Sequence, residues 1–109
     1  MLESLLGSIC KEKVLIFILC REEGYAREIA KFYEIPLTPV INQLKKLESS
    51  SIIFARSQGR TKVYKFNPRY QFLPELKKLL EKAVNFYPQQ LQQKLLYNRR
   101  RPRRSNKAL

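Results

Sequence analysis

The stretch YAREIAKFYEIPLTPVINQLKKLESSSII, residues 25–53, gives the strongest structural signal in the chain. Residues 25–33 have the apolar spacing of a short helix with Ile29 facing inward, and Pro36 breaks that helix. A further helix is predicted from about residue 37 to about residue 48, because prolines are tolerated in a first helical turn, where N–H groups lack intrahelical partners. Two short helices joined by a tight turn predict a helix-turn-helix unit.

The second of these helices has two chemically different faces. At about 100° per residue, Leu37, Leu44 and Leu47 fall within about 60° of Val40 and form a buried stripe. The opposite face is polar and cationic, and it holds the candidate contacts Thr38, Pro39, Ile41, Asn42, Lys45 and Lys46. A short face of this kind, with few acids, is what a helix needs to enter the major groove of DNA. The alternative is an ordinary solvated face, which typically mixes Glu and Lys.

The next segment, SSSIIFARSQGRTKVYKFNP at residues 49–68, predicts a β-hairpin over about residues 52–67 that turns at Gln58 and Gly59. Basic side chains surround this turn and can face a phosphate backbone or a minor groove. The candidate contacts are Arg56, Arg60, Thr61 and Lys62, with Lys65 in the same cluster. Side chains alternate between the two faces of a strand along residues 63–66. We therefore expect one face of the second strand to pack on the helices and the other to be exposed to solvent.

An apolar helix is predicted before this unit. Residues 8–21 have helical spacing, and two leucines at residues 5 and 6 can add a turn before Gly7. The run VLIFILC, residues 14–20, leaves a buried strand open as an alternative. A helix that is apolar on nearly every side needs cover on more than one face, which indicates a dimer interface.

Two helical segments are predicted after the hairpin. Residues 72–87 form an amphipathic helix that begins near Pro74 and is interrupted at Pro88. Residues 89–97 can add another turn or two, which is marginal in isolation. We expect a homodimer through the first and C-terminal helices. The predicted fold class is mainly α with a small β-hairpin wing, a winged helix-turn-helix domain over residues 1–97.

The charge balance indicates a polyanionic partner. The chain has 22 Lys and Arg against 9 acidic residues, a formal net charge of +13. Residues 94–109 hold seven basic residues and no acid, which leaves +6 (15 − 9) on the preceding part. We predict that residues 98–109 are a disordered basic tail whose Arg99, Arg100 and Arg101 follow phosphates or enter a minor groove. The alternative is a solvated, disordered end.

The composition excludes most catalytic and metal sites. The chain contains no His, no Trp and no Asp, which removes serine-protease triads, Cys-His pairs and HExxH zinc sites. We therefore expect no enzyme, no cofactor and no metal. Cys10 and Cys20 would lie about 15 Å apart along one helix and cannot bridge each other within it. We interpret them as small buried hydrophobes; an intersubunit disulfide or a thiol sensor is the alternative.

The hydropathy pattern predicts an intracellular protein. The longest apolar run, residues 14–20, is much shorter than the roughly 18 residues of a membrane span. The segment MLESLLGS carries an acid where a signal peptide would be positive. We expect no membrane contact and a cytoplasmic location with the nucleoid.

Residues 5–87 resemble the ArsR-like and MarR-like winged-helix regulators of bacteria and archaea. The most diagnostic segments are AREIA, residues 26–30, and VINQLKKLESSSII, residues 40–53. The resemblance implies a homodimer that binds a palindromic operator in double-stranded DNA and regulates transcription. It also implies that Ala30 lets the two helices cross closely and that the polar face around Asn42 contacts the groove. An Asn can pair bidentately with adenine.

The sequence departs from this family at two places. Serines at residues 49–51 stand where the family usually has Gly, and no Cys or His stands at the positions that bind metal in metal-sensing members. We therefore predict no metal response. The alternatives to a regulator are a winged helix that binds RNA, or DNA without sequence preference, and one that binds protein. The aromatic residues lie largely at core spacing, which disfavours RNA.

Overall fold

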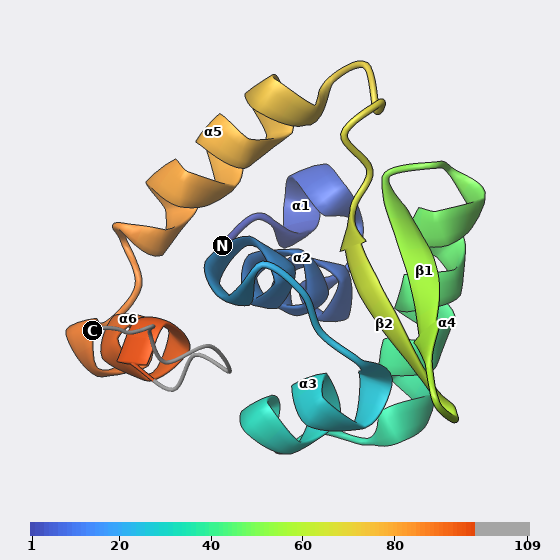
Figure 1. Cartoon of the computed structure of the whole chain (residues 1–109). Coiled ribbons are helices and arrows are strands. Elements are labelled where there is room, and N and C mark those ends of the chain that lie inside the picture. Colours follow the sequence, from blue (N-terminus) through green and yellow to red (C-terminus); the bar gives the residue numbers. More distant parts are fainter. Residues whose placement is uncertain (98–109) are drawn as a thin grey trace, which may run out of the picture.

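The computed structural model describes residues 1–97; the predicted contacts Arg99, Arg100 and Arg101, and the whole segment 98–109, lie outside the described residues. The elements are in the predicted order, as Figure 1 shows. They are α1 (Glu3–Leu6), α2 (Ile9–Arg21), α3 (Ala26–Tyr33), α4 (Leu37–Ser49), β1 (Ile53–Gln58), β2 (Thr61–Phe66), α5 (Leu73–Val84) and α6 (Gln89–Tyr97).

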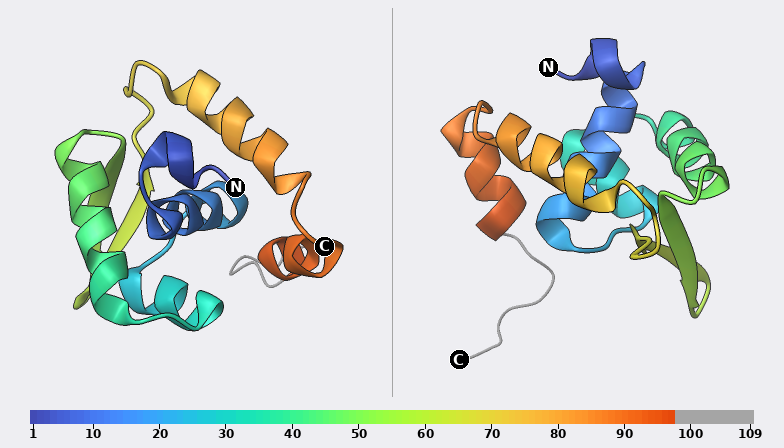
Figure 2. Two further views of the ribbon diagram at one scale, coloured as in Figure 1. Left: turned by 180° about the vertical axis from the view of Figure 1, so that it is seen from behind. Right: turned by 90° about the horizontal axis from the view of Figure 1, so that it is seen from above.

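Helix α2 lies at the centre and is covered by the other elements. Its side chains Val14, Ile16, Phe17 and Ile18 are all 0% exposed. Figure 2 shows α4 and the hairpin on one side of α2 and α5 and α6 on the other. The prediction of a helix that is apolar all round is confirmed, and the alternative of a strand over residues 14–20 is wrong. Elements of the same chain cover this helix, so its apolar faces do not form the dimer interface that the sequence indicated. No helix within residues 1–97 is long and apolar enough to cross a membrane.

The helix-turn-helix is formed by α3 and α4. Helix α3 ends at Tyr33 and is followed by Glu34, which has a left-handed φ of 57°; the Ile35 N–H donates to the Ala30 carbonyl at 3.0 Å. Pro36 then caps α4 in an extended conformation. The predicted stripe of α4 is buried: Val40 and Leu44 are 0% exposed and Leu47 is 2% exposed. The apolar pattern thus fixes which face of α4 turns outward.

A serine takes the place of the glycine expected after α4. Ser51 has a φ of 63°, in the left-handed region that usually favours Gly. Its N–H donates to the Glu48 carbonyl at 3.0 Å, and its carbonyl accepts a 3.0 Å hydrogen bond from the Asn67 side chain. These local bonds hold the chain in the turn that leads into β1.

Strands β1 and β2 form the predicted antiparallel hairpin, with Ile53 opposite Phe66 at one end and Gln58 opposite Thr61 at the turn. Gly24 forms an isolated bridge with β2. The Gly24 N–H donates to the Tyr64 carbonyl at 3.1 Å, and the Tyr64 N–H donates to the Gly24 carbonyl at 2.8 Å. This bridge attaches the hairpin to the α2–α3 connection.

The predicted alternation along β2 is wrong at its centre, where Val63 and Tyr64 are consecutive and both buried. Tyr64 belongs to the main hydrophobic cluster. Val63 lies opposite Arg56, whose guanidinium reaches to 3.9 Å from the Glu23 carboxylate. The long side chain of Arg56 therefore lies beside Val63, on the strand face that was expected to be exposed to solvent.

Helix α5 ends at Val84, three residues before the predicted end. Tyr87 instead turns inward, and its hydroxyl donates to the carboxylate of Glu12, which is only 4% exposed and also accepts the Leu2 N–H at 2.7 Å. Burial and then the hydrogen bond to Glu12 raise the pKa of the Tyr87 hydroxyl. A buried carboxylate on α2 thereby fixes the connection between α5 and α6.

Helix α6 is a continuous helix of nine residues, although its sequence predicts marginal helicity. Leu95 is 0% exposed and belongs to the same cluster as the residues of α2. Packing on α2 therefore stabilises a helix whose own propensity is low.

We predict that Gly24→Ala lowers the free energy of unfolding by about 1–3 kcal/mol, the usual cost of overpacking. A Cβ at residue 24 would lie 2.9 Å from Cε1 of Phe17, whose ring is held edge-on by Phe32 at a centroid distance of 5.5 Å. Urea unfolding followed by circular dichroism measures the change. Gly59→Asn is the control, because residue 59 has a φ of 63° with nothing within 4 Å of an added Cβ. Equal losses in both variants would contradict this packing argument.

Candidate nucleic-acid interface

The outward face of α4 presents polar and cationic groups. Of the predicted contacts, Ile41 is half-buried and the others are exposed: Thr38, Pro39, Asn42, Lys45 and Lys46. The buried stripe holds the opposite side of the helix in the core, so this face has a fixed direction. The first acidic residue on the exposed side is Glu48, near the end of the helix.

The turn of the hairpin and the start of α4 both lie at the lower end of the molecule in Figure 1. Arg60, Thr61 and Lys62 are exposed around Gly59, as predicted. The view from above in Figure 2 shows that the hairpin extends away from α4, so its turn and the helix are separate parts of this surface. We call the exposed face of α4 together with residues 60–62 the α4–hairpin edge.

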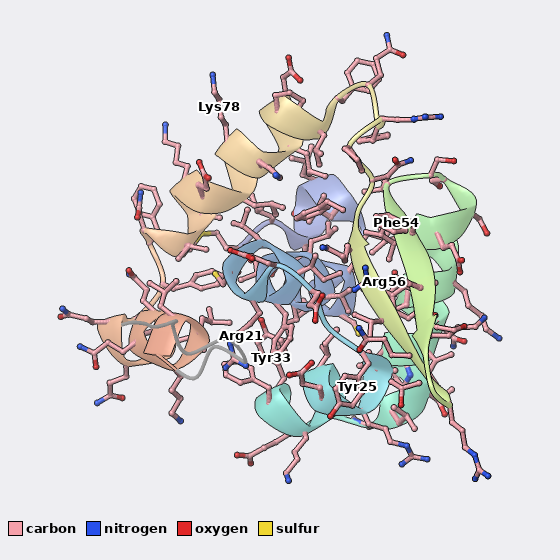
Figure 3. All side chains as sticks on the ribbon, viewed as in Figure 1. Arg21, Tyr25, Tyr33, Phe54, Arg56 and Lys78 are labelled. Atoms are coloured by element: carbon pink, nitrogen blue, oxygen red, sulfur yellow. The ribbon has the colours of Figure 1, made fainter. Side chains whose placement is uncertain are left out.

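Two of the predicted hairpin cations lie away from the turn. Arg56 is part-way along β1, where its 53% exposed side chain lies 3.9 Å from the 10% exposed side chain of Glu23 (Figure 3). Lys65 lies opposite Phe54 near the other end of the hairpin. The prediction that both cluster around the turn is wrong, because the register places them two or more pairs from it. Arg60 and Lys62 are the cations at the turn.

Helix α3 supplies two cations that were not among the predicted contacts. Arg27 and Lys31 are both exposed and lie four residues apart, on one side of α3. Helix α3 packs against α4, and the first helix of a helix-turn-helix typically crosses the DNA backbone. In the sequence these two residues are visible as a basic pair at helical spacing, i and i+4.

A separate apolar patch lies around α1 and the end of α5. Two large apolar side chains are strongly exposed there, Met1 by 58% and Phe86 by 67%. A groove of about 490 Å³ runs through the patch and is lined by Met1, Leu2, Leu79, Lys82, Ala83 and Phe86. Lys78, on the same helix α5, points away from α4 and the hairpin in Figure 3. The molecule thus has a cationic edge and a distinct apolar patch.

The cysteines and acids do not assemble a metal site within residues 1–97, where no group of three or more His, Cys, Asp or Glu could hold an ion. Cys20 is buried and Cys10 is half-buried, and neither forms a disulfide within residues 1–97. Burial raises the pKa of the Cys10 thiol, which keeps it in the less reactive protonated form.

No protein-family model and no curated protein matches the chain. Among solved structures, its fold is similar to that of ZitR from Lactococcus lactis, in the apo form of a double mutant. The TM-score is 0.55 and the sequences are 18% identical, over 83% of this chain and 70% of that chain. A likeness at this identity concerns the fold, and with the helices and antiparallel hairpin described above it confirms the winged helix-turn-helix class.

We predict that Lys45→Gln, Lys46→Gln and Arg60→Gln each change the free energy of unfolding by less than about 0.5 kcal/mol, because these side chains lie outside the core. Leu44→Ala, on the buried face of the same helix, should cost about 2–5 kcal/mol. Chemical unfolding of the four variants checks both expectations. Large losses at the two lysines would mean that they serve the fold and are not free to serve a ligand.

Proposed function

We propose that the chain is a sequence-specific DNA-binding regulator of transcription that acts as a homodimer. Helix α4 would enter the major groove of double-stranded DNA, and the hairpin turn would contact the backbone or the minor groove. The ArsR-like and MarR-like assignment and a cytoplasmic, nucleoid-associated location belong to the same proposal. No catalytic step and no cofactor is part of it.

The observation that carries the proposal is the α4–hairpin edge. A helix with one face fixed in the core presents Asn42 and two lysines outward, and the exposed turn of the hairpin adds Arg60 and Lys62. Amide side chains can read base edges, whereas lysines and arginines chiefly neutralise phosphates. The edge therefore combines groups for specificity with groups for affinity. Arg27 and Lys31 on α3 would add contacts to the backbone.

The apolar patch supports the dimer. A monomer gains nothing from exposing Met1 and Phe86 along a groove of about 490 Å³. In a twofold dimer the patch of one copy packs on the same patch of the other copy, so Phe86 of one copy can enter the groove of its partner. Because the patch is distinct from the α4–hairpin edge, two copies can join there and keep both edges open for DNA.

The second candidate is RNA binding or DNA binding without sequence preference. Single-stranded nucleic acids are usually bound by bases stacking on exposed aromatic side chains. Phe54 on β1 is 38% exposed, and Phe72 and Phe86 are 57% and 67% exposed. These three do not form one platform, since Phe72 and Phe86 lie at opposite ends of α5. This arrangement favours duplex DNA.

We predict that Asn42→Ala reduces the preference for a selected duplex over random DNA by about 1–3 kcal/mol, because a bidentate contact to one base is lost. Lys45→Gln is the matched control on the same face. It should weaken binding to all sequences alike and reduce the slope of log affinity against log salt by about one. Competition anisotropy with selected duplex, random duplex and single-stranded RNA measures both effects. The base-reading role is wrong if Asn42→Ala weakens all sequences equally, and a preference for the RNA would support the second candidate.

We predict that Phe86→Glu converts the dimer into a monomer, because a charge would be buried in the partner's apolar groove. Phe72→Glu is the control, since Phe72 is similarly exposed but lies at the other end of α5. Light scattering on both variants, with circular dichroism to check folding, gives the result. A dimer that survives Phe86→Glu, or a wild-type chain that is monomeric, contradicts the proposed interface.

A further inference from the structure

A cavity of about 330 Å³ lies between α2, the end of α3 and the start of α6. Glu12 and Lys13 line it from α2, Tyr33 is the last residue of α3, and Leu91 belongs to α6. Tyr33 is labelled in Figure 3. Sites for small molecules usually measure roughly 300–1,000 Å³ and combine apolar walls with a few polar groups. The cavity is large enough for a small ligand, and its polar groups indicate which kind.

A buried carboxylate forms part of the cavity wall. Glu12 is only 4% exposed, its Oε1 accepts the Leu2 N–H at 2.7 Å, and its Oε2 accepts the Tyr87 hydroxyl. The Met1 ammonium, which also pairs with Glu3, lies 3.3 Å from Oε1. A buried carboxylate is stabilised by hydrogen bonds and by a neighbouring cation. The ammonium group of a ligand can therefore take the place beside Glu12 that the Met1 ammonium has in the structure.

The Tyr33 hydroxyl is a second polar group of the cavity. It is buried and has no hydrogen-bond partner among residues 1–97. Burial raises the pKa of Tyr33, so the hydroxyl stays neutral and can both donate and accept a hydrogen bond. An unpartnered buried hydroxyl lowers stability, and a polar atom of a ligand would satisfy it.

The cavity also carries a positive charge and apolar walls. Lys13 is half-buried, and its Nζ lies 5.5 Å from the ring centroid of Tyr33. Ile9 and Leu91 add apolar surface. An anionic group and a cationic group thus line one cavity together with aromatic and aliphatic side chains. A complementary ligand has an ammonium group, a carboxylate and an apolar body.

We propose that this cavity binds a free α-amino acid with an apolar side chain. The ammonium group of the ligand lies beside the Glu12 carboxylate, and the carboxylate of the ligand lies beside the Lys13 ammonium. The ligand side chain packs against Ile9, Leu91 and the ring of Tyr33. A zwitterion matches both charges of the cavity, whereas an amine or a carboxylic acid matches one. None of these residues belongs to the α4–hairpin edge, so the inference does not depend on DNA binding.

The first test compares matched ligands by isothermal titration calorimetry on the full chain. One set is L-phenylalanine, phenethylamine, which lacks the carboxylate, and 3-phenylpropionate, which lacks the ammonium group. The second set is L-leucine, 3-methylbutylamine and 4-methylpentanoate. We expect at least one amino acid to bind about five-fold or more tightly than both of its analogues, because each charge-assisted hydrogen bond adds affinity. An analogue that binds as tightly as its amino acid, or no binding of either amino acid at millimolar concentration, would overturn the proposal.

The second test assigns the contacts with variants that leave Glu12 in place, because Glu12 also fixes the α5–α6 connection. Tyr33→Phe should keep or raise the melting temperature, since it removes an unpartnered hydroxyl, yet weaken binding of the amino acid by about five-fold. Lys13→Gln should weaken binding of the amino acid and of the carboxylate analogue but not of the amine. Lys78→Gln, at an exposed lysine of α5, is the matched control and should change none of the three.

Unchanged affinity in Tyr33→Phe, or equal losses in Lys13→Gln and Lys78→Gln, would refute the assigned contacts and with them the site. All titrations are made without DNA. Their failure therefore leaves the proposed function standing, and a chain that binds no duplex leaves the amino-acid site standing.

Discussion

Burial of α2 on all sides is the constraint on which the remaining structure depends. Its apolar residues point in every direction around the helix, and each large one gains roughly 1.5–3 kcal/mol when it leaves water. No single neighbouring layer can cover such a helix. The chain therefore surrounds it with α3 and α4, the hairpin, and the two C-terminal helices, and Phe17, Ile18 and Leu15 are at most 1% exposed.

This arrangement determines which surfaces remain for function. Helix α4 uses Val40, Leu44 and Leu47 to cover α2, so its polar residues turn outward. The bridge between Gly24 and Tyr64 attaches β2 to the α2–α3 connection, so the hairpin is anchored to the core. The cover supplied by α1 and α5 is incomplete and leaves an apolar patch with Phe86 at its edge. The same packing thus generates a cationic edge and, apart from it, a surface suited to self-association.

Features that depend on local periodicity are the ones best predicted from the sequence. The bounds of α2 and α4, the buried stripe of α4 and the hairpin turn at Gly59 all depend on apolar spacing and turn chemistry, and the structure confirms them. The exposure of Asn42, Lys45 and Lys46 can be deduced directly from the sequence, because the helix face opposite a buried stripe is exposed to solvent. The roles of these residues in binding stay a prediction.

The errors concern features that depend on distant residues. Tyr87 leaves the helical pattern because a carboxylate 75 residues earlier, on Glu12, accepts its hydroxyl. Val63 is buried although the period predicts exposure, and Arg56 lies beside an acid on another element. Periodicity contains no information on such partners.

The proposed DNA interface can be mapped residue by residue on the full chain. Isotope-labelled protein is titrated with a selected duplex while backbone amide chemical shifts are recorded by nuclear magnetic resonance. We predict that the largest shifts occur at Thr38, Asn42 and the hairpin turn around Arg60, whereas amides near Leu79 in the apolar groove stay unchanged. Shifts concentrated on α5, with α4 and the hairpin turn unaffected by saturating duplex, would contradict the proposed interface.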